Sequence, residues 1–408
     1  MRILFVAPFL PSPPRFGGQR RLDGLMRSLA KNHALTVLAF NATDPFTQLS
    51  LDATREYCDE VVTFPDMEFL DGRRKRLLQA RSLLSPHSYE HLLVTRRSEF
   101  SARLRAFVAS GRFDIVQIEF CQMAALRFPL DGSRRYRLAL DEHNIEYDIV
   151  RRTAGAEVSA TRRAYSSVNW RKLRREERAS WRWVDGVSVT SERDASVLRQ
   201  DEPRTALSVV PNGVDVDAFQ PAATTPEAEN LLFFGAMNYY PNQDGIGFFV
   251  EQVLPRILAR RPRLKLWIVG PGSDALQRLR GPNVEVTGFV DAVEPYIDRA
   301  SAVVVPLRIG GGTRLKIVEA MAKAKAIVST RIGAEGIDLG HDEHALLADT
   351  PEDFAAQVER ILTDAALAKR LGAAARELAV GRYSWPALAQ GLEGFYGQLL
   401  AAPPKPAC

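Results

Sequence analysis

The sequence has little cysteine and lacks a long hydrophobic run. Three cysteines in 408 residues, Cys58, Cys121 and Cys408, are too few and too far apart for a disulfide framework or a paired-cysteine zinc site. We therefore expect reduced thiols, as in a cytoplasmic protein. No apolar stretch approaches the ~20 residues that span a bilayer, so no membrane-spanning helix is predicted.

The N-terminal segment has only part of the character of a signal peptide. Residues 1–10 combine a basic start with an apolar run, but Pro8 interrupts the run. Three further prolines follow by position 14, and no small-x-small cleavage site appears. We predict instead that residues 3–7 form a buried first strand.

The composition is that of a globular protein with unevenly distributed charge. Hydrophobic residues make up 46% and charged residues 25% of the chain, which excludes wholesale disorder. The net charge is +5, but residues 1–210 carry +8 and residues 211–408 carry −3. The basic first half predicts an anionic partner.

Short apolar runs alternate with amphipathic helical patterns along the chain, which is typical of an α/β protein. In the first half we predict strands at 3–7, 35–40, 115–119, 137–141, 187–190 and 208–210. In the second half we predict strands at 231–235, 265–270, 284–287, 302–307, 326–330 and 345–348.

A break in this pattern divides the chain. Pro211 begins a Pro-Asn-Gly turn, and residues 220–226 have the composition of a linker. We predict Rossmann-like domains at 1–210 and 211–384, and a C-terminal helix and tail at 385–408 that pack back on the first domain. Ligands of such doubly wound sheets bind beyond the carboxyl ends of the strands. We therefore expect the two domains to face each other across a ligand-binding cleft.

The densest group of candidate functional residues follows the strand predicted at 302–307. A glycine loop there lets backbone N–H groups approach an anion, and a helix that begins near the end of the loop adds partial positive charge. We assign phosphate binding to the loop residues Gly310, Gly311, Gly312 and Thr313 and to the cations Arg308, Arg314 and Lys316. Glu319, one helical turn beyond Lys316, could accept hydrogen bonds from sugar hydroxyls. A tight turn with a solvated Lys–Glu pair is the structural alternative.

This segment resembles the donor-nucleotide site of the retaining glycosyltransferases of family 4, which have the two-domain GT-B fold. Further similar segments lie at 210–215, 234–242, 267–272, 286–289 and 333–336. The resemblance covers essentially the whole C-terminal half. It implies that Asn212 and Gly235 also belong to the donor site and that Arg308 and Lys316 act on the leaving diphosphate.

One position departs from the family pattern. The family has two glutamates eight positions apart; Glu319 fits the second, but Gly311 stands in place of the first. In the family the first glutamate contacts the transferred sugar. The departure therefore puts the identity of the sugar in doubt more than the class of reaction. Lys316 resembles an alternative family pattern in which a lysine holds the donor phosphates.

In the first half the resemblance rests mainly on two short segments. Gly17 and Gly18 follow the first predicted strand and open a helix, a geometry suited to binding a phosphate. His143 follows the strand predicted at 137–141. The resemblance implies that the glycines face the donor diphosphate and that His143 contacts the donor sugar or diphosphate. A loop tip without ligand and a structural histidine are the alternatives.

Other patterns imitate functional motifs. Asp215-Val-Asp217 matches a metal-binding motif of the other main glycosyltransferase fold but lies in the linker, and family 4 implies metal-independent chemistry. Residues 270–275 imitate a dinucleotide motif, but inside the second half rather than at the start of a domain. We therefore expect no metal and no nicotinamide cofactor. Two histidine pairs are interpreted as surface residues: His87 with His91, and His341 with His344.

Two basic segments are candidates for an anionic membrane surface. Residues 73–84 combine basic side chains with leucines, and residues 162–182 combine them with tryptophans. Basic helices with apolar side chains suit such surfaces, although a solvated helix face is an equal alternative. Nucleic acid binding is not predicted, because no nucleic-acid motif accompanies the charge.

Together these observations predict an enzyme that transfers a hexosyl unit from a nucleotide-diphosphate sugar to a glycan or lipid-linked acceptor. The resemblance implies retention of configuration. We expect a cytoplasmic protein, peripheral on the inner membrane face if the basic segments bind lipid. A nucleotide-sugar epimerase or hydrolase of the same architecture and a non-catalytic nucleotide-sugar-binding protein are the alternatives.

Overall fold

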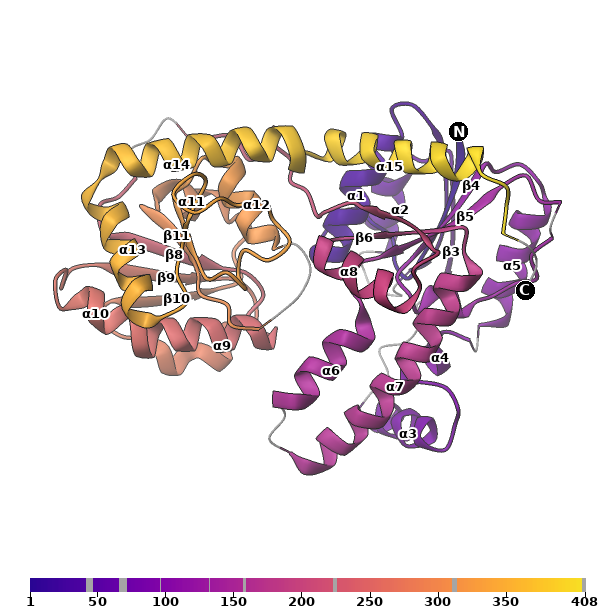
Figure 1. Cartoon of the computed structure of the whole chain (residues 1–408), viewed down its shortest axis with the longest axis horizontal. Helices are drawn as coiled ribbons and strands as arrows, with labels where there is room; N and C mark the ends of the chain where they lie inside the picture. The colour runs from indigo at the N-terminus through magenta and orange to yellow at the C-terminus, as the bar shows by residue number, and fades with distance from the viewer. Residues whose placement is uncertain are drawn as a thin grey trace. The chain divides into compact units, whose positions relative to one another are not determined.

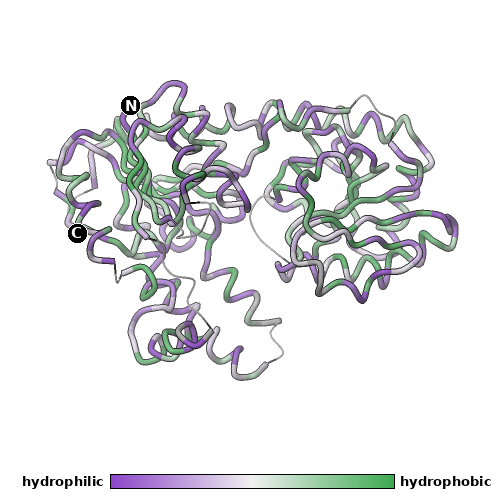
Figure 2. The backbone as a smooth tube through the Cα atoms, turned by 180° about the vertical axis from the view of Figure 1, so that it is seen from behind, coloured by the Kyte–Doolittle hydropathy of each residue, from purple (hydrophilic) through white to green (hydrophobic). Residues whose placement is uncertain are grey.

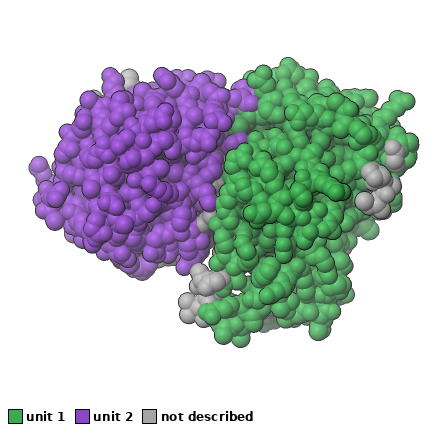
Figure 3. Space-filling model, in the orientation of Figure 1, with its two compact units in different colours: residues 1–210, 388–408 green, residues 211–387 purple. Residues whose placement is uncertain are grey.

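The chain forms two compact units (Figure 3), one of residues Met1–Val210 with Leu388–Cys408 and the other of Pro211–Ala387. The computed structural model describes residues 1–41, 47–65, 72–95, 97–131, 133–156, 159–222, 226–309 and 314–405. We call the two parts unit 1 and unit 2.

Unit 1 is built on a parallel sheet with the strand order β3-β2-β1-β4-β5-β6-β7. Its strands are β1 (Arg2–Ala7), β2 (Ala34–Asn41), β3 (Glu60–Pro65), β4 (Ile115–Glu119), β5 (Arg137–Glu142), β6 (Gly186–Val189) and β7 (Ala206–Val209). Its helices are α1 (Gly17–Leu29), α2 (Thr47–Arg55), α3 (Gly72–Leu83), α4 (Tyr89–Val94), α5 (Ser98–Ala109), η1 (Met123–Ala125), α6 (Glu146–Ala156), α7 (Ala160–Trp183), α8 (Glu192–Asp201) and α15 (Trp385–Ala401). Helices α6 and α7 extend together away from the sheet (Figure 1).

Unit 2 has a second parallel sheet with the order β10-β9-β8-β11-β12-β13. Its strands are β8 (Asn230–Phe234), β9 (Lys265–Val269), β10 (Val284–Gly288), β11 (Ala302–Val305), β12 (Ile327–Ser329) and β13 (Leu346–Leu347). Its helices are α9 (Tyr240–Phe248), η2 (Phe249–Val253), α10 (Leu254–Leu258), η3 (Ser273–Leu279), α11 (Glu294–Arg299), α12 (Leu315–Ala322), α13 (Pro351–Thr363), α14 (Ala365–Leu378) and η4 (Ala379–Tyr383).

Burial explains why these sequences form strands. The central strands are covered on both faces, so β8 and β11 are buried at every residue. Hydrophobic segments accordingly run through the interior of each unit (Figure 2). Helix α1 buries one apolar stripe, with Leu22, Leu25 and Met26 turned inward, whereas α12 is buried from Lys316 to Ala322.

The predicted fold class is confirmed: both units are doubly wound parallel α/β sheets. Every strand that we predicted is present, and β3 is an additional strand that the sequence interpretation missed. β3 lies at the edge of the sheet and is only half-buried, so its hydrophobic signal is weaker than that of the central strands.

Helix α15 packs on unit 1 although it follows unit 2 in the chain. Its side chains Phe395 and Leu399 lie against Gly186 of β6, where an added Cβ would be only 2.7 Å from each of them. The Arg137 guanidinium, on β5, donates to the carbonyl oxygens of Leu399 and Ala402 at the helix end. Close packing and hydrogen bonds from the buried Arg137 guanidinium therefore hold α15 against the first sheet.

A buried ion pair joins the elements of unit 1. Arg21 of α1 is 1% exposed and makes a bidentate contact with Asp141 of β5, with N···O distances of 2.8 and 2.9 Å. Ser188 of β6 donates to the same carboxylate, and Arg21 donates to the Val210 carbonyl oxygen just beyond β7. Burial by itself would raise the pKa of Asp141, but the charges of Arg21 and His143 and the hydrogen bonds from Arg21 and Ser188 together hold that pKa below its usual value.

Removal of one partner of this pair should destabilise unit 1 strongly. We expect Arg21→Met or Asp141→Asn to lower the free energy of unfolding by ~3–5 kcal/mol, because each leaves a buried charge without its partner. Urea unfolding followed by circular dichroism and tryptophan fluorescence measures the change.

The matched control is Arg199→Ala in the same unit. Arg199 and Glu192 form an exposed pair at 3.2 Å, and such pairs contribute ~0–1 kcal/mol. Equal effects of Arg21→Met and Arg199→Ala would contradict the proposed importance of the buried pair.

Candidate functional site

In unit 2 the candidate site lies at the carboxyl end of β8. Gly235 follows this strand with a φ of 138°, a conformation that favours glycine. A Cβ at this position would lie 3.2 Å from the Lys316 Nζ and 3.2 Å from the Asn242 Nδ2. The glycine thus leaves space for these two side chains, which come from α12 and α9.

Lys316 is the central cation of this site. Its Nζ donates to the Asn242 Oδ1 at 2.7 Å and lies 4.0 Å from the centroid of the Phe233 ring. Burial lowers the pKa of Lys316 to about 7; the neighbouring Arg314 charge also lowers it, and Glu319 opposes the shift. A second negative charge, such as that of a phosphate, would favour the charged form of this lysine.

The other predicted donor-site residues have different surroundings. Arg314 and Glu319 are buried beside Lys316. Arg308 instead makes a bidentate ion pair with Asp244, at 2.6 and 3.0 Å, and is about half exposed. Asn212 is partly buried at the start of unit 2. Gly310, Gly311, Gly312 and Thr313 lie outside the described residues, so their predicted contact with phosphate stays a prediction, as do the roles of the other residues.

In unit 1 the candidate site is a buried acid–base cluster around His143. The His143 Nε2 lies 2.9 Å from the Glu119 Oε2 and 3.4 Å from the Asp141 Oδ2, so the ring adjoins the Arg21–Asp141 pair. Burial raises the pKa of Glu119, although its hydrogen bond with His143 opposes the shift. His143 itself is 7% exposed, and the carboxylates of Glu119 on β4 and Asp141 on β5 position its ring.

The same structure brings His143 close to the predicted glycines. The Phe120 ring stacks on the imidazole with the ring centroids 3.7 Å apart. A Cβ added to Gly18 would lie 3.0 Å from the Cζ of the same Phe120 ring. Gly17 and Gly18 open α1 as predicted, and Phe120 connects them to His143.

Sequence reasoning missed several of these groups. Phe120 has a φ of 66°, a strained backbone for an aromatic residue, and such residues cluster at functional sites. Glu119 and Arg21 are charged residues in positions that bury them. In the sequence, Glu119 at a strand end and Arg21 inside an amphipathic helix only weakly indicate a functional site. Their importance becomes visible once the folded sheet brings them close to His143 and Asp141.

The motifs that we set aside have structural explanations, with one correction. The Asp215 carboxylate accepts backbone N–H groups of Asp217 and Ala218 and so caps a turn. Gly270 is required because a Cβ there would lie 2.0 Å from the Gly235 carbonyl oxygen. The interpretation of the two histidine pairs as surface residues holds for His87 and His341, at 44% and 40% exposure. It is wrong for His91 and His344, whose side chains are only 21% and 17% exposed. His87 and His91 line a cavity.

Comparisons with known proteins place the two halves in one family. Residues 17–218 match the model described as Glycosyltransferase Family 4, and residues 228–364 match that of Glycosyl transferases group 1. The chain belongs to glycosyltransferase family 4. The candidate donor-site residues of this family-4 chain that the structure describes all lie within these two matched ranges.

Curated relatives of the family-4 chain are distant. Phosphatidyl-myo-inositol mannosyltransferase of Mycobacterium tuberculosis is 30% identical over 203 residues, which cover 46% of this chain and 53% of the relative. A 44.6 kDa protein encoded in the cps region of Klebsiella pneumoniae is 25% identical over 139 residues, or 32% of this chain and 36% of the relative. The chain thus spans about half or less of the length of these two relatives.

Solved structures share the fold over the whole family-4 chain. Sucrose-phosphate synthase from Thermosynechococcus elongatus has a TM-score of 0.71 at 18% identity, with 98% of this chain and 99% of that chain covered. HepE from Anabaena, solved in complex with UDP and glucose, has a TM-score of 0.65 at 15% identity, with 97% and 99% covered. At these identities the likeness concerns the fold.

The lowered pKa of Lys316 predicts proton uptake when a nucleoside diphosphate binds. At about pH 8, one unit above a pKa of about 7, roughly nine in ten Lys316 side chains are neutral. A bound diphosphate raises this pKa, so binding of whichever of UDP, GDP and ADP has affinity should take up close to one proton. Calorimetry in buffers of different ionisation enthalpy measures the uptake.

Lys316→Met is the control for this proton, since it keeps the length of the side chain without the amine. Uptake should vanish in this variant while residual binding is still measurable at high nucleotide concentration. Proton release by the wild type, or unchanged uptake by the variant, would contradict the assignment.

Proposed function

We propose that the protein transfers a hexosyl unit from a nucleotide-diphosphate sugar to the hydroxyl of a glycan or lipid-linked acceptor, with retention of configuration. The observation that carries the proposal is the buried Lys316 ammonium beside Gly235 and Asn242, in the half that matches the group 1 glycosyltransferases. This half binds the donor. The basic unit 1 binds the acceptor.

Stabilisation of the leaving diphosphate is the main task of the donor site in this proposal. Negative charge develops on the diphosphate as the bond to the sugar breaks, and a preorganised cation lowers the energy of that transition state. Lys316 is held by Asn242 and by its burial, so little reorganisation is needed when the charge appears. Glu319 holds hydroxyls of the nucleotide sugar.

The proposed transfer step uses protein groups alone. Arg314, Lys316 and the N-terminus of α12 supply positive charge at the diphosphate. Arg308 joins them if the phosphate competes successfully with Asp244 for its guanidinium. His143 is proposed to contact the transferred sugar, with its ring oriented by Glu119 and Phe120.

Two printed names among the relatives bear on the acceptor. The mycobacterial relative is named as a phosphatidyl-myo-inositol mannosyltransferase, and a Schizosaccharomyces pombe relative as a phosphatidylinositol N-acetylglucosaminyltransferase subunit. Both names refer to a lipid acceptor. This supports the proposal that the acceptor here is lipid-linked.

Truncation of Lys316 should abolish most of the activity and keep the fold. Removal of one preorganised donor at a developing oxyanion costs ~100–1000-fold in turnover, and we expect Lys316→Ala to fall in this range. A thermal-shift screen of UDP-, GDP- and ADP-sugars first identifies the donor, since the correct one stabilises the protein. Transfer to lipid-linked acceptors is then measured with that donor.

The matched control is Lys369→Ala on an exposed position of α14, which should leave transfer unchanged. Near-wild-type transfer by Lys316→Ala would overturn the assignment of this residue. Product analysis tests the reaction itself: a new nucleotide sugar formed without acceptor identifies an epimerase, and free sugar identifies a hydrolase.

A membrane-facing surface is the second part of the proposal, and we assign it to α3. No described helix is both long and apolar enough to cross a membrane. On α3 and just after it, however, Leu77 and Leu84 are 71% and 93% exposed. The basic residues Arg73, Lys75, Arg76 and Arg81 are exposed on the same short segment. Exposed leucines among basic side chains suit the surface of an anionic bilayer on its inner face.

The other basic segment, on α7, does not have the expected character. Its Trp181 and Trp183 are buried, at 0% and 6% exposure. Three of its arginines form ion pairs with acidic residues at the end of α8: Arg174 with Asp201, and Arg178 and Arg182 with Glu202. The C-terminal part of α7 is therefore packed and neutralised, so Trp181, Trp183 and these three arginines do not form the expected basic aromatic surface. Membrane binding by the rest of the segment stays a prediction.

Neutralisation of two basic residues on α3 should weaken binding to anionic vesicles. Lys75→Ala with Arg76→Ala removes two charges at ~1 kcal/mol each, so partitioning should fall roughly 30-fold. Cosedimentation with vesicles that contain an anionic phospholipid measures it. The control is Arg260→Ala with Arg263→Ala on unit 2, exposed residues that should not matter. Equal binding by both double variants would remove α3 from the proposal.

A further inference from the structure

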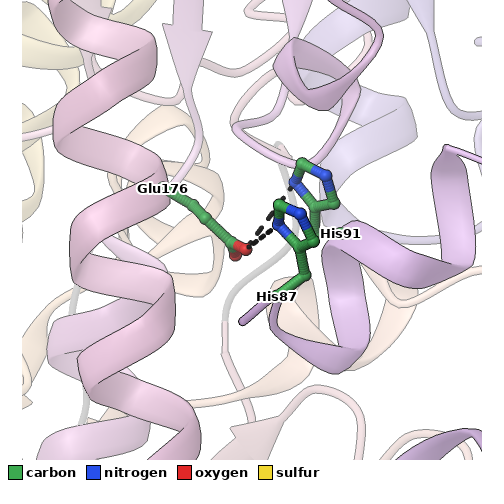
Figure 4. Close-up of side chains that lie close together, drawn as sticks. All are labelled: His87, His91 and Glu176. Atoms are coloured by element: carbon green, nitrogen blue, oxygen red, sulfur yellow. Dashed lines mark hydrogen bonds and ion pairs between the residues drawn. The ribbon is translucent and has the colours of Figure 1, made fainter. Parts of the chain in front are cut away.

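A cavity of about 630 Å³ lies in unit 1, lined by residues in and near α4, η1 and α7. His87, just before α4, His91, within it, and Glu176 of α7 line this cavity, and their polar ends point toward one another (Figure 4). No residue of this cluster belongs to the candidate transfer site. The cluster therefore calls for an explanation of its own.

The two imidazoles present the same atom to one carboxylate. The Nδ1 atoms of His87 and His91 lie 3.2 and 3.7 Å from the Glu176 Oε1, and the rings stack nearly in parallel with centroids 4.1 Å apart. One nitrogen from each ring and one carboxylate oxygen all lie within 4.8 Å of one another. The arrangement thus brings two imidazole nitrogens and one carboxylate oxygen close together.

The His87 Nδ1 is within hydrogen-bond distance of the Glu176 Oε1, but both His–Glu distances also match ligands that share a metal ion. The 3.7 Å separation between His91 and Glu176 is too long for a hydrogen bond. Two ligands at ~2.0–2.1 Å from a tetrahedral Zn²⁺ are ~3.3 Å apart, and the two His–Glu distances lie on either side of that value. Small adjustments of the side chains would complete the geometry.

Local structure already holds the three ligands in place. The Ser88 side chain caps α4 by accepting the His91 backbone N–H at 3.1 Å. The Ser88 backbone N–H donates to the Glu176 Oε1 at 3.0 Å, which ties the start of α4 to α7. The histidines are four positions apart, and both rings lie on the same side of the chain (Figure 4). A preformed site loses little conformational entropy on binding an ion.

The cavity lining carries charges of both signs. It includes four carboxyl groups, Glu90, Glu146, Glu176 and Glu177, and two guanidinium groups, Arg127 and Arg175. Burial raises the pKa of Glu146 to about 7 and that of Glu177 to about 8, so the lining is close to charge balance near neutral pH. The case for a metal therefore rests on the geometry of the three ligands.

We propose that His87, His91 and Glu176 form a binding site for a divalent transition metal, and that Zn²⁺ fits it best. Two imidazoles and one carboxylate leave the fourth tetrahedral position of zinc for water or for an oxygen ligand that enters from the cavity. The metal would link the start of α4 to α7 and is separate from the transfer step, for which we propose no metal. The site is thus an addition to the proposed function and does not depend on it.

Two other groups of potential ligands are less suitable. In the group of Glu119, Asp141 and His143, the Arg21 guanidinium already occupies the Asp141 carboxylate and would repel a dication. In the group of Cys121, Glu142 and Glu177, both Glu177 oxygens accept backbone N–H groups at the start of α6, whereas the Ser88 backbone N–H binds Glu176 at one oxygen, Oε1. The histidine cluster therefore remains the best ligand set among the described residues.

The test is titration of untagged, chelator-stripped full-length protein with Zn²⁺, in competition with a chromophoric chelator. We expect one Zn²⁺ per chain, and a tetrahedral visible absorption spectrum when Co²⁺ replaces it. His87→Ala, His91→Ala and Glu176→Gln should each weaken binding at least ~10-fold, since even residues that only support metal ligands cost that much. His87 is 44% exposed, so its variant should fold normally.

His341→Ala with His344→Ala is the matched control, because it removes a second pair of nearby histidines in unit 2 and should leave Zn²⁺ binding unchanged. The proposal is overturned if the wild type binds no Zn²⁺. It is also overturned if the three variants bind like the wild type, or if the control loses the metal. Circular dichroism of every variant verifies that loss of binding is not loss of fold.

Discussion

The parallel direction of the strands is the constraint on which this protein depends. All described strands within each sheet run parallel, so their carboxyl ends lie along one edge and the side chains that follow them are brought together. Gly235 follows β8, and His143 follows β5. Because the central strands are buried on both faces, their side chains are mostly apolar, and many of the polar groups of the candidate sites lie at or near the strand ends.

Burial then gives those polar groups their properties. Burial lowers the pKa of Lys316, which lies beside Phe233 and Asn242, to about 7, whereas Arg21 is also buried but faces Asp141. In the proposed function Lys316 meets the donor diphosphate, while Arg21 is already matched within the protein. The same physical penalty for a buried charge thus underlies the proposed donor site of unit 2 and the structural organisation of unit 1.

The uneven charge of the chain has a similar division of roles. Many basic residues of unit 1 form ion pairs within the unit, such as Arg174 with Asp201 and Arg182 with Glu202. The basic residues of α3 lie beside exposed leucines instead and remain the better candidates for a lipid surface. Net charge by sequence segment therefore does not show which basic residues are available to a partner, because that depends on their tertiary contacts.

The sequence by itself determined the alternation of strands and helices and the family, because buried strands, glycine turns and helix starts leave local patterns. It also pointed to Lys316, whose role at a donor site stays a prediction. It could not find Phe120 or Glu119 as neighbours of His143, and it took His91 for a surface residue. Those relations join residues distant in the chain, as with His91 and Glu176 on α4 and α7. Only tertiary packing decides such distances, because local propensity carries no information about which buried charge meets which partner.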